Sequence, residues 1–473
     1  MCIVCTLTGL GFPNSLSSLV STQQSRTDSQ QENWKDCRSE NPERRIAACS
    51  ALIGSQMDGS SKLAEAFDDR GLAYLQQRDL DRALRDFNQV LRLRPRWARA
   101  FYNRGLTHAE MGDYADASRD LDQAASLDPN SAETFYSRGL THAHEGEYLD
   151  AIRDYSKAVQ LRPNFPDAFY GRGWVHARLR EYKDAIQDYS QALTLSPNNA
   201  GILKDRGQAY WQLGEYDRAI SDLNTSLQLD PNNSEARNAR GLAYWRKGNV
   251  ASAIRDYDEA LRLCPTCPDA LYNRGLAYES KGDHDRAIAD YDGAIRLKPT
   301  DADSLYDRGL AYMQKGNYDR SIRDYADALR INPNHARALN ALGLAFTHKG
   351  NYDDAIQAYD LALKSNPMFV DALANRATAY EHKGEYGRAI QGYNQALQLS
   401  PHFADAFRGR CVAEAHTGAY GGAVSDWLRW QYFKYGFLGF TARVLILLIA
   451  IAFSFWLTRF SDKFAWNRPR HLA

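Results

Sequence analysis

Hydrophobic and polar residues follow a helical period along most of the chain, and the pattern recurs in units of 34 residues. In residues 100–112, AFYNRGLTHAEMG, apolar positions recur at i, i+4 and i+7, and Gly112 follows the last of them. After a short acidic turn, residues 114–129, YADASRDLDQAASLDP, repeat the pattern and end at Pro129. Each unit therefore predicts two helices joined by a tight turn.

Prolines fix the length of the unit because they recur at intervals of 34 residues. They are Pro95, Pro129, Pro163, Pro197, Pro231, Pro265, Pro299, Pro333, Pro367 and Pro401. If each unit starts as the first does at Ala64, proline is position 32, and eleven copies run without insertion over residues 64–437. Strict periodicity of this kind is typical of repeat architectures.

Three further positions indicate how the two helices pack. Position 8 is glycine in nine copies, from Gly71 to Gly343, and position 20 is alanine or serine. Position 24 is aromatic or leucine, from Phe87 to Trp427. Small residues let helix backbones approach closely, and the large residue at position 24 fills the remaining space.

This pattern resembles the tetratricopeptide-repeat family, in an array of bacterial type with an Arg-Gly variant of the first helix. The resemblance rests on glycine 8, tyrosine 11, alanine 20, aromatic 24, alanine 27 and proline 32, and covers residues 64–437. It implies an all-α, right-handed superhelical solenoid of helix-turn-helix repeats whose first helices line a concave groove. Each repeat buries its apolar face only against its neighbours.

Position 7 departs from the family, because arginine replaces the usual leucine in ten copies, while position 23 is aspartate in nine. Repeat nine loses both residues together, with Leu342 and Ala358. This covariation predicts an Arg–Asp pair between the two helices of one repeat, exemplified by Arg138 and Asp154. A guanidinium suits such a bidentate contact better than an ammonium does.

The resemblance also implies a binding surface, because positions 2, 5, 6, 9, 12 and 13 of the first helix face the groove in the family. Tyrosine and tryptophan are enriched at binding hot spots, and some relatives use asparagine at position 6 to hold a peptide backbone. The candidate groove residues are Tyr102, Asn103, Tyr136, Tyr170, Trp174, Trp211, Trp245, Tyr272, Asn273, Tyr306 and Asn375. For the tyrosines at position 5, packing against the neighbouring repeat is an equal alternative.

Composition narrows the class of function. With 58 basic and 58 acidic residues the chain has no general positive field, so a nucleic-acid partner is not expected. No phosphate loop, HExxH or GxSxG motif occurs, and we predict neither catalysis nor a cofactor nor a small-molecule substrate. Two functions remain open: an adaptor, tethered to a membrane, that binds a protein or peptide in its groove, and an assembly factor of a membrane or envelope complex that acts through its convex face.

Histidines and cysteines are the residues of this sequence that suggest a metal or redox site. His348, His382 and His416 share position 13, but equivalent residues of stacked hairpins stand roughly 9–10 Å apart, too far to share one metal ion. His108, His142 and His176, at position 11, are expected to replace the packed tyrosine, so no metal site is predicted. Cys264 and Cys267 have redox-motif spacing, but Cys264 ends a helix, which disfavours that role.

The two ends differ from the array. Residues 1–30 form a largely uncharged segment, either a tail or a signal peptide without its basic region, and residues 31–63 read as a degenerate capping repeat in which Cys37 and Cys49 could form a disulfide. Residues 437–458 predict a transmembrane helix that contacts lipid, and residues 459–473 a short basic tail. A single-pass membrane protein is therefore expected. The charges flanking the span place the repeats outside the cytoplasm, whereas a C-terminal anchor alone usually leaves them in the cytosol.

Overall fold

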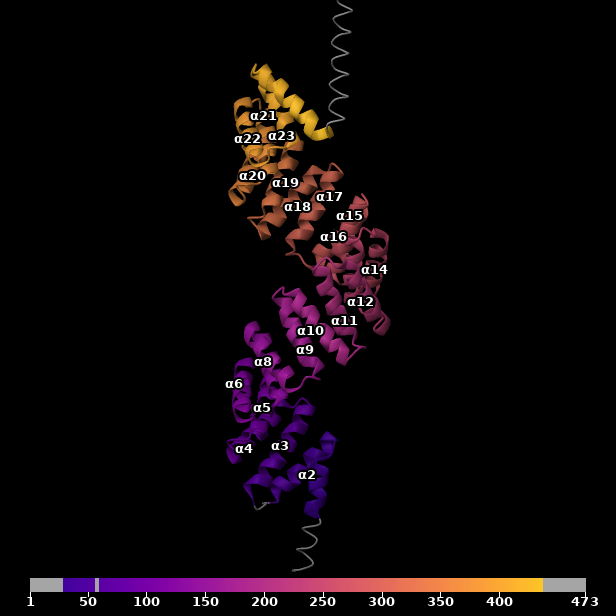
Figure 1. The fold of residues 1–473 in the computed structure, drawn as a ribbon, viewed down its shortest axis with the longest axis vertical. Helices are drawn as coiled ribbons and strands as arrows, with labels where there is room; N and C mark the ends of the chain where they lie inside the picture. Colours follow the sequence, from indigo (N-terminus) through magenta and orange to yellow (C-terminus); the bar gives the residue numbers. More distant parts are fainter. Residues whose placement is uncertain (1–28, 56–58, 437–473) are drawn as a thin grey trace, which may run out of the picture. The chain divides into compact units, whose positions relative to one another are not determined.

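The computed structural model describes residues 29–55 and 59–436, and every regular element in these ranges is a helix. The described chain divides into two compact units, with the boundary along the chain between Asn232 and Asn233. Each unit is a stack of antiparallel helix pairs, as the 34-residue pattern predicts (Figure 1).

The first unit contains helical residues 29–37 and eleven longer helices. These are α2 (Pro42–Gly54), α3 (Ser60–Gln76), α4 (Leu80–Leu93), α5 (Ala98–Met111), α6 (Tyr114–Leu127), α7 (Ala132–Glu145), α8 (Tyr148–Leu161), α9 (Pro166–Arg178), α10 (Tyr182–Leu195), α11 (Ala200–Gln212) and α12 (Tyr216–Leu229).

The second unit contains the remaining repeats and ends in helical residues 420–436. Its other helices are α13 (Ser234–Arg246), α14 (Val250–Leu263), α15 (Pro268–Ser280), α16 (His284–Leu297), α17 (Ala302–Gln314), α18 (Tyr318–Ile331), α19 (Ala336–His348), α20 (Tyr352–Ser365), α21 (Val370–His382), α22 (Tyr386–Leu399) and α23 (Ala404–His416).

The core of each repeat is the contact between positions 8 and 24. Tyr257 is fully buried, and a Cβ atom on Gly241 would stand 2.6 Å from its ring. A methyl group at this distance would clash, so glycine is required for the two helices to approach. The same arrangement recurs where Gly309 faces Tyr325 and where Gly343 faces Tyr359.

Glycine has a second role at the end of the first helix. Gly112 and Gly146 follow α5 and α7 with φ of +83°, a left-handed conformation that side chains disfavour. Their backbone N–H groups return to carbonyls of the last turn, which ends the helix and starts the turn into its partner. The prediction that Gly112 stops its helix is confirmed.

The prediction of a transmembrane helix is corrected. In residues 29–55 and 59–436 no helix is both long and apolar enough to cross a bilayer. Helices α2 to α23 have 13 to 17 residues, at most about 26 Å, and charged side chains interrupt their apolar stripes. Residues 437–458, on which the prediction rested, lie outside the described residues. We therefore withdraw the single-pass localisation, the membrane tether and the lipid contact.

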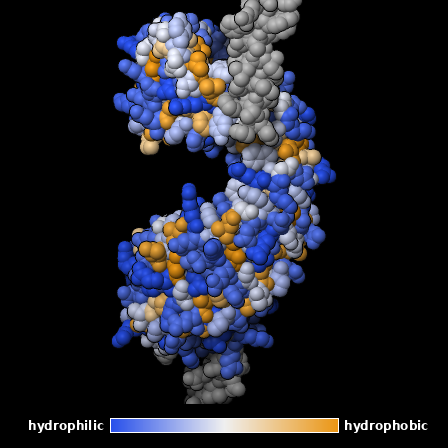
Figure 2. Space-filling view, turned by 45° about the horizontal axis from the view of Figure 1, so that its top comes forward, coloured by the Kyte–Doolittle hydropathy of each residue, from blue (hydrophilic) through white to orange (hydrophobic). Residues whose placement is uncertain are grey.

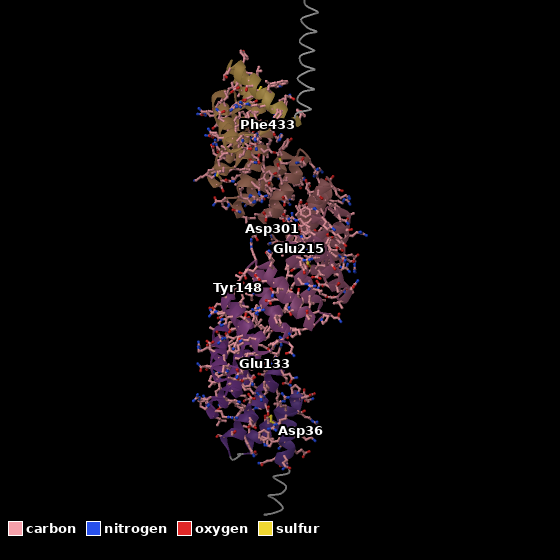
Figure 3. All side chains as sticks on the ribbon, in the orientation of Figure 1. Asp36, Glu133, Tyr148, Glu215, Asp301 and Phe433 are labelled. Atoms are coloured by element: carbon pink, nitrogen blue, oxygen red, sulfur yellow. A yellow bond between two sulfur atoms is a disulfide. The ribbon has the colours of Figure 1, made fainter. Side chains whose placement is uncertain are left out.

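The N-terminal prediction falls partly outside the described residues, which begin at residue 29. Within the predicted capping repeat, a disulfide joins Cys37 to Cys49, beside Asp36 in Figure 3. Both cysteines are fully buried and pack with Leu52 and with Ala66 of α3. This small hairpin therefore covers the apolar side of the first full repeat.

Candidate functional site

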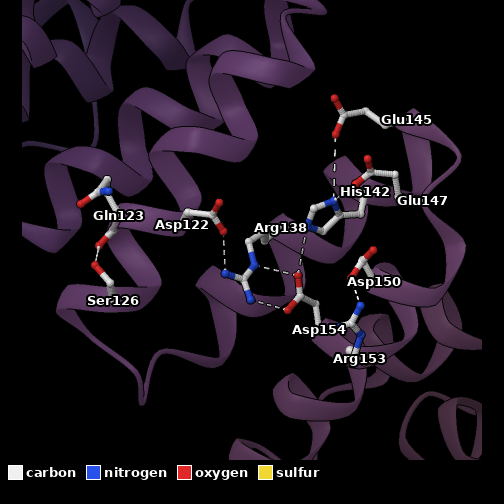
Figure 4. A network of polar contacts seen from close by, with 10 residues as sticks. All are labelled: Asp122, Gln123, Ser126, Arg138, His142, Glu145, Glu147, Asp150, Arg153 and Asp154. Atoms are coloured by element: carbon white, nitrogen blue, oxygen red, sulfur yellow. Dashed lines mark hydrogen bonds and ion pairs between the residues drawn. The ribbon is translucent and has the colours of Figure 1, made fainter.

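The Arg–Asp pair of each repeat connects its two helices. Arg138 on α7 donates from Nε and Nη2 to the two carboxylate oxygens of Asp154 on α8, at 2.8 and 2.6 Å (Figure 4). Asp154 is buried, and its hydrogen bond raises the pKa of the Arg138 guanidinium. The same bidentate contact joins Arg70–Asp86, Arg104–Asp120, Arg172–Asp188, Arg206–Asp222, Arg240–Asp256, Arg274–Asp290, Arg308–Asp324 and Arg410–Asp426.

Each arginine also reaches the preceding repeat, which the sequence reasoning missed. Nη1 of Arg138 donates to Asp122 of α6, at position 25, over 2.8 Å. Equivalent bonds run from Arg104 to Asn88 and from Arg274 to Asp258. One guanidinium therefore connects the two helices of its own repeat and also binds the second helix of the preceding repeat. The signal was present in the sequence, because position 25 is polar before every such arginine.

Positions 5 and 6 of successive first helices form a second series of contacts. The Tyr170 hydroxyl donates to Asp205 at 2.7 Å, and the Tyr272 hydroxyl donates to Asp307 at 2.7 Å. The predicted peptide-holding asparagines are bonded in the same way: Asn103 to Asp68, Asn273 to Asn238 and Asn375 to Asn340. Ser137 donates to the Tyr102 hydroxyl at 3.5 Å. These side chains connect neighbouring repeats.

This series is interrupted between repeats three and four. Tyr136 at position 5 faces Gly171 at position 6, which has no side chain to accept a hydrogen bond; Tyr306 likewise faces Ala341. A cavity of about 280 Å³ opens there between α7 and α9. It is lined by Tyr136, Leu140, Ala143, His144, Tyr155, Tyr170, Gly171 and Trp174. We name it the α7/α9 pocket.

The walls of the α7/α9 pocket are mostly apolar, and two of them are unusually exposed. Leu140 is 44 % exposed and Trp174 is 38 % exposed, both at position 9 of their repeats. The floor is the ring of Tyr155, against which a Cβ on Gly171 would lie at 2.8 Å. On the face seen in Figure 2, hydrophobic residues form patches among hydrophilic ones.

The remaining predicted groove residues are distributed over both units. Trp174 and Trp211 belong to the first unit and Trp245 to the second, so the predicted aromatic group divides between the units. Tyr306 lies against Tyr325, with ring centroids 5.9 Å apart, and against His335. Tyr272 lies against Tyr291 in the same way. Both position 5 tyrosines therefore pack against other side chains of the array, which is the alternative to a role in the groove.

The histidines at position 13 are arranged as rings stacked on tyrosines. His348 stacks on Tyr318 and His416 on Tyr386, with centroids 5.0 and 4.5 Å apart. Cys264 and Cys267 form a disulfide across the turn between α14 and α15. Cys267 directly precedes the first turn of α15, and Cys264 ends α14.

A family model described as tetratricopeptide repeat matches residues 102–164, 136–200, 204–268, 306–367, 350–402 and 375–429, more than half of the chain. Two further models of the same kind match residues 70–132 and 280–316. No curated protein matches the chain in sequence.

The solved structures to which the chain is similar have low sequence identity to it and TM-scores below 0.5. The Cut9–Hcn1 complex of APC/C is 16 % identical, with 87 % of this chain and 94 % of that chain covered and a TM-score of 0.44. A repeat protein from Parabacteroides merdae is 20 % identical over 53 % and 98 %, with a TM-score of 0.45. Yeast Tom70 is 15 % identical over 84 % and 97 %, with a TM-score of 0.37.

Because these TM-scores lie below 0.5, the assignment rests on the sequence match and on the repeat geometry. Proteins of this type are typically non-catalytic scaffolds that bind protein or peptide partners. From the 34-residue hairpins, the position 8 to position 24 packing and the matched segments, the chain belongs to the tetratricopeptide-repeat family.

Proposed function

We propose that this protein is a non-enzymatic adaptor that binds a basic peptide segment of a partner protein along the first helices of its first unit. In this proposal, one apolar side chain of the segment enters the α7/α9 pocket. The observation that supports it most is the gap opposite Tyr136, where Gly171 leaves an apolar recess between two regularly packed helices.

The size and lining of the recess suit a side chain better than a cofactor. A volume of about 280 Å³ lies at the lower limit of small-molecule pockets, which run from about 300 to 1,000 Å³. Its exposed walls, Leu140 and Trp174, are of the apolar and aromatic type that lines hot-spot pockets at protein interfaces. The Tyr136 hydroxyl could donate to a backbone carbonyl of the bound segment.

Charge favours a basic partner. At the groove positions the first five repeats carry six acidic residues besides the buried Asp68: Glu65, Asp69, Glu110, Glu133, Asp167 and Asp205. They carry only three basic residues: Arg99, Arg178 and Lys204. An acidic surface steers a basic ligand and repels an acidic one.

The experiment is a peptide array probed with the full-length protein. Peptides of one length would carry lysine or arginine around a single leucine, phenylalanine or tryptophan, with matched sets in which the charges are acidic or the apolar residue is alanine. We expect binding only when positive charge and the apolar residue occur together. Affinities of the bound peptides would then be measured in solution for three proteins.

The three proteins are the wild type, Trp174→Ala and Leu149→Ala. Trp174→Ala should weaken binding about 30-fold, which corresponds to about 2 kcal/mol for a hot-spot residue. Leu149 is 71 % exposed on α8, outside the pocket, and Leu149→Ala should leave affinity unchanged. Equal binding by wild type and Trp174→Ala, with helical content intact, would refute the proposed site. Loss with Leu149→Ala would instead favour the second helices as the binding face.

A further inference from the structure

Two histidines in neighbouring repeats stand in the same polar surroundings. His142 and His176 occupy position 11, which is tyrosine in most other repeats. Nδ1 of His142 lies 2.7 Å from an oxygen of Glu147 and 4.0 Å from an oxygen of Glu145 (Figure 4). Nδ1 of His176 lies 2.7 Å from an oxygen of Glu181, and Asp184 completes its group.

In each group three potential ligand atoms converge. The histidine nitrogen and the two carboxylate oxygens all lie within 4.8 Å of one another. They come from the end of the first helix and the start of the second, so each group closes the turn of its hairpin, α7–α8 or α9–α10. The glutamates that contact Nδ1, Glu147 and Glu181, are about half exposed, so an ion from solvent could reach them.

The other ring nitrogen faces a buried carboxylate. Nε2 of His142 lies 3.7 Å from Asp154, and Nε2 of His176 lies 3.9 Å from Asp188. Arginines hold both aspartates bidentately, so their positions are fixed. A negative charge beside Nε2 favours the tautomer with its proton there, as in carboxylate–histidine–metal arrangements. In the metal-free protein Nδ1 and the glutamate oxygen, 2.7 Å apart, share a hydrogen-bonding proton. With the N–H on Nε2, a cation can take the place of that proton.

We propose that His142, Glu145 and Glu147 form one binding site for a divalent transition-metal ion, and that His176, Glu181 and Asp184 form a second. One imidazole nitrogen and two carboxylate oxygens are a donor set suited to Zn²⁺, with solvent or a partner residue as the fourth ligand. Each ion would tie the two helices of one hairpin together at their turn. The proposal is independent of peptide binding at the α7/α9 pocket.

Repeat two provides an internal comparison. His108 faces Asp113 and Asp120 at 4.0 and 3.9 Å, in the same arrangement as repeat four. Aspartate replaces glutamate at position 16, and its side chain is one methylene shorter. The carboxylate therefore stops short of Nδ1, and His108 is in neither of the two groups found among the described residues. The proposal therefore comprises two metal sites, and the short side chain of Asp113 explains why repeat two does not form a third.

The test is calorimetric titration of the chelator-treated full-length protein with Zn²⁺ alone. We expect the wild type to bind two ions per chain at the proposed sites. Glu147→Gln and Glu181→Gln should each bind one, and the double variant should bind none at these sites. Asp113→Glu should raise the number to three. Glu110→Gln, which changes an acid of α5 outside these groups, is the matched control and should bind as the wild type does.

Because Glu147 and Glu181 are half exposed, their replacement should not disturb folding, which circular dichroism would check. A stoichiometry unchanged by the double variant would refute the proposal, since Zn²⁺ would then be bound elsewhere. Absence of saturable binding to the wild type would refute it as well. It would mean that a proton, and not a metal ion, bridges each histidine and its glutamate.

Discussion

Ala377 and Gly392 occupy reciprocal positions in repeat ten: the Cβ atom of Ala377 lies 2.9 Å from the point where a Cβ on Gly392 would stand. In repeats one to eight glycine is at position 8 and aspartate at position 23, as in Gly173 and Asp188. A Cβ on Gly173 would lie 3.1 Å from that of Asp188. In repeats one to eight the side chain stands on the second helix, and in repeat ten the methyl group stands on the first. Repeat eleven carries a side chain at both positions, Cys411 and Asp426.

This reciprocity predicts a non-additive pair of substitutions. Gly392→Asp alone should destabilise the protein by about 1–3 kcal/mol, because its Cβ would overpack against Ala377. With Ala377→Gly added, much of the loss should be recovered, since the pair then matches repeats one to eight. Arg376 would also gain a carboxylate for its Nε, which is buried and makes no hydrogen bond within the described residues. Urea unfolding of both single variants and the double variant measures the coupling, and additive losses would contradict the prediction.

The Arg138–Asp154 pair gives a second test. Arg138→Leu should cost about 1–3 kcal/mol, because it leaves the buried carboxylate of Asp154 without its bidentate partner. Adding Asp154→Ala should recover part of this loss, since repeat nine already carries Leu342 and Ala358. Thermal unfolding of the four proteins of this cycle would measure the coupling. If the double variant lost the sum of the two single effects, the pair would contribute nothing.

Two buried tyrosines provide a matched comparison. Tyr325 and Tyr359 are both fully buried at position 24. The Tyr359 hydroxyl is 3.2 Å from the Thr347 hydroxyl, whereas the Tyr325 hydroxyl makes no hydrogen bond among the described residues. Tyr359→Phe should therefore cost about 0.5–1.5 kcal/mol, and Tyr325→Phe should be neutral or stabilising. Chemical unfolding would measure both, and the reverse order would show that the two hydroxyls are not distinguished by their bonding.

Asp68 predicts a dependence of stability on pH. Burial raises its pKa from 3.8 to about 6, although Arg99 lies 3.0 Å away. The folded protein therefore holds a proton that the unfolded chain has released between pH 4 and 6, so stability should fall as pH rises through this range and then level off. Asp68→Asn should flatten this fall, because the amide does not titrate and still accepts from Asn103. Unfolding midpoints at pH 4.5 and 7.5 measure the effect, and an equal fall in the variant would assign it to other groups.

Repeat nine shows how far covariation in the sequence can predict structure. The joint loss of arginine 7 and aspartate 23 identified the Arg–Asp pair before any coordinates. The same reasoning could have found the third partner, because Ala326, at position 25 of repeat eight, precedes Leu342. The position 25 side chain, the arginine and the aspartate of the network are thus all replaced together, by Ala326, Leu342 and Ala358. The inter-repeat bond was missed because position 25 was not compared with the next repeat.

The repeat period bears only on residues of different repeats, whereas each proposed metal site lies within one hairpin. The period predicts that equivalent histidines of different repeats stand roughly 9–10 Å apart, which is too far for them to share one metal ion. It says nothing of what surrounds a histidine within its own hairpin. His142 meets Glu147 only because the chain reverses at Gly146 and brings the start of α8 beside the end of α7.

The sequence by itself determined the helices, the hairpin and the family, because the small and large residues that pack each repeat recur every 34 residues. It also determined the Arg–Asp pair, because one repeat loses both members. The tertiary structure alone decided which side chains are free to bind. Positions 5 and 6 of successive repeats meet across 35 residues of sequence, and a hydrogen bond there occupies side chains that look available in the sequence, such as Asn103. Only the register of neighbouring helices shows that Gly171 stands opposite Tyr136, and that register is set by packing between repeats, which the period of a single repeat does not encode.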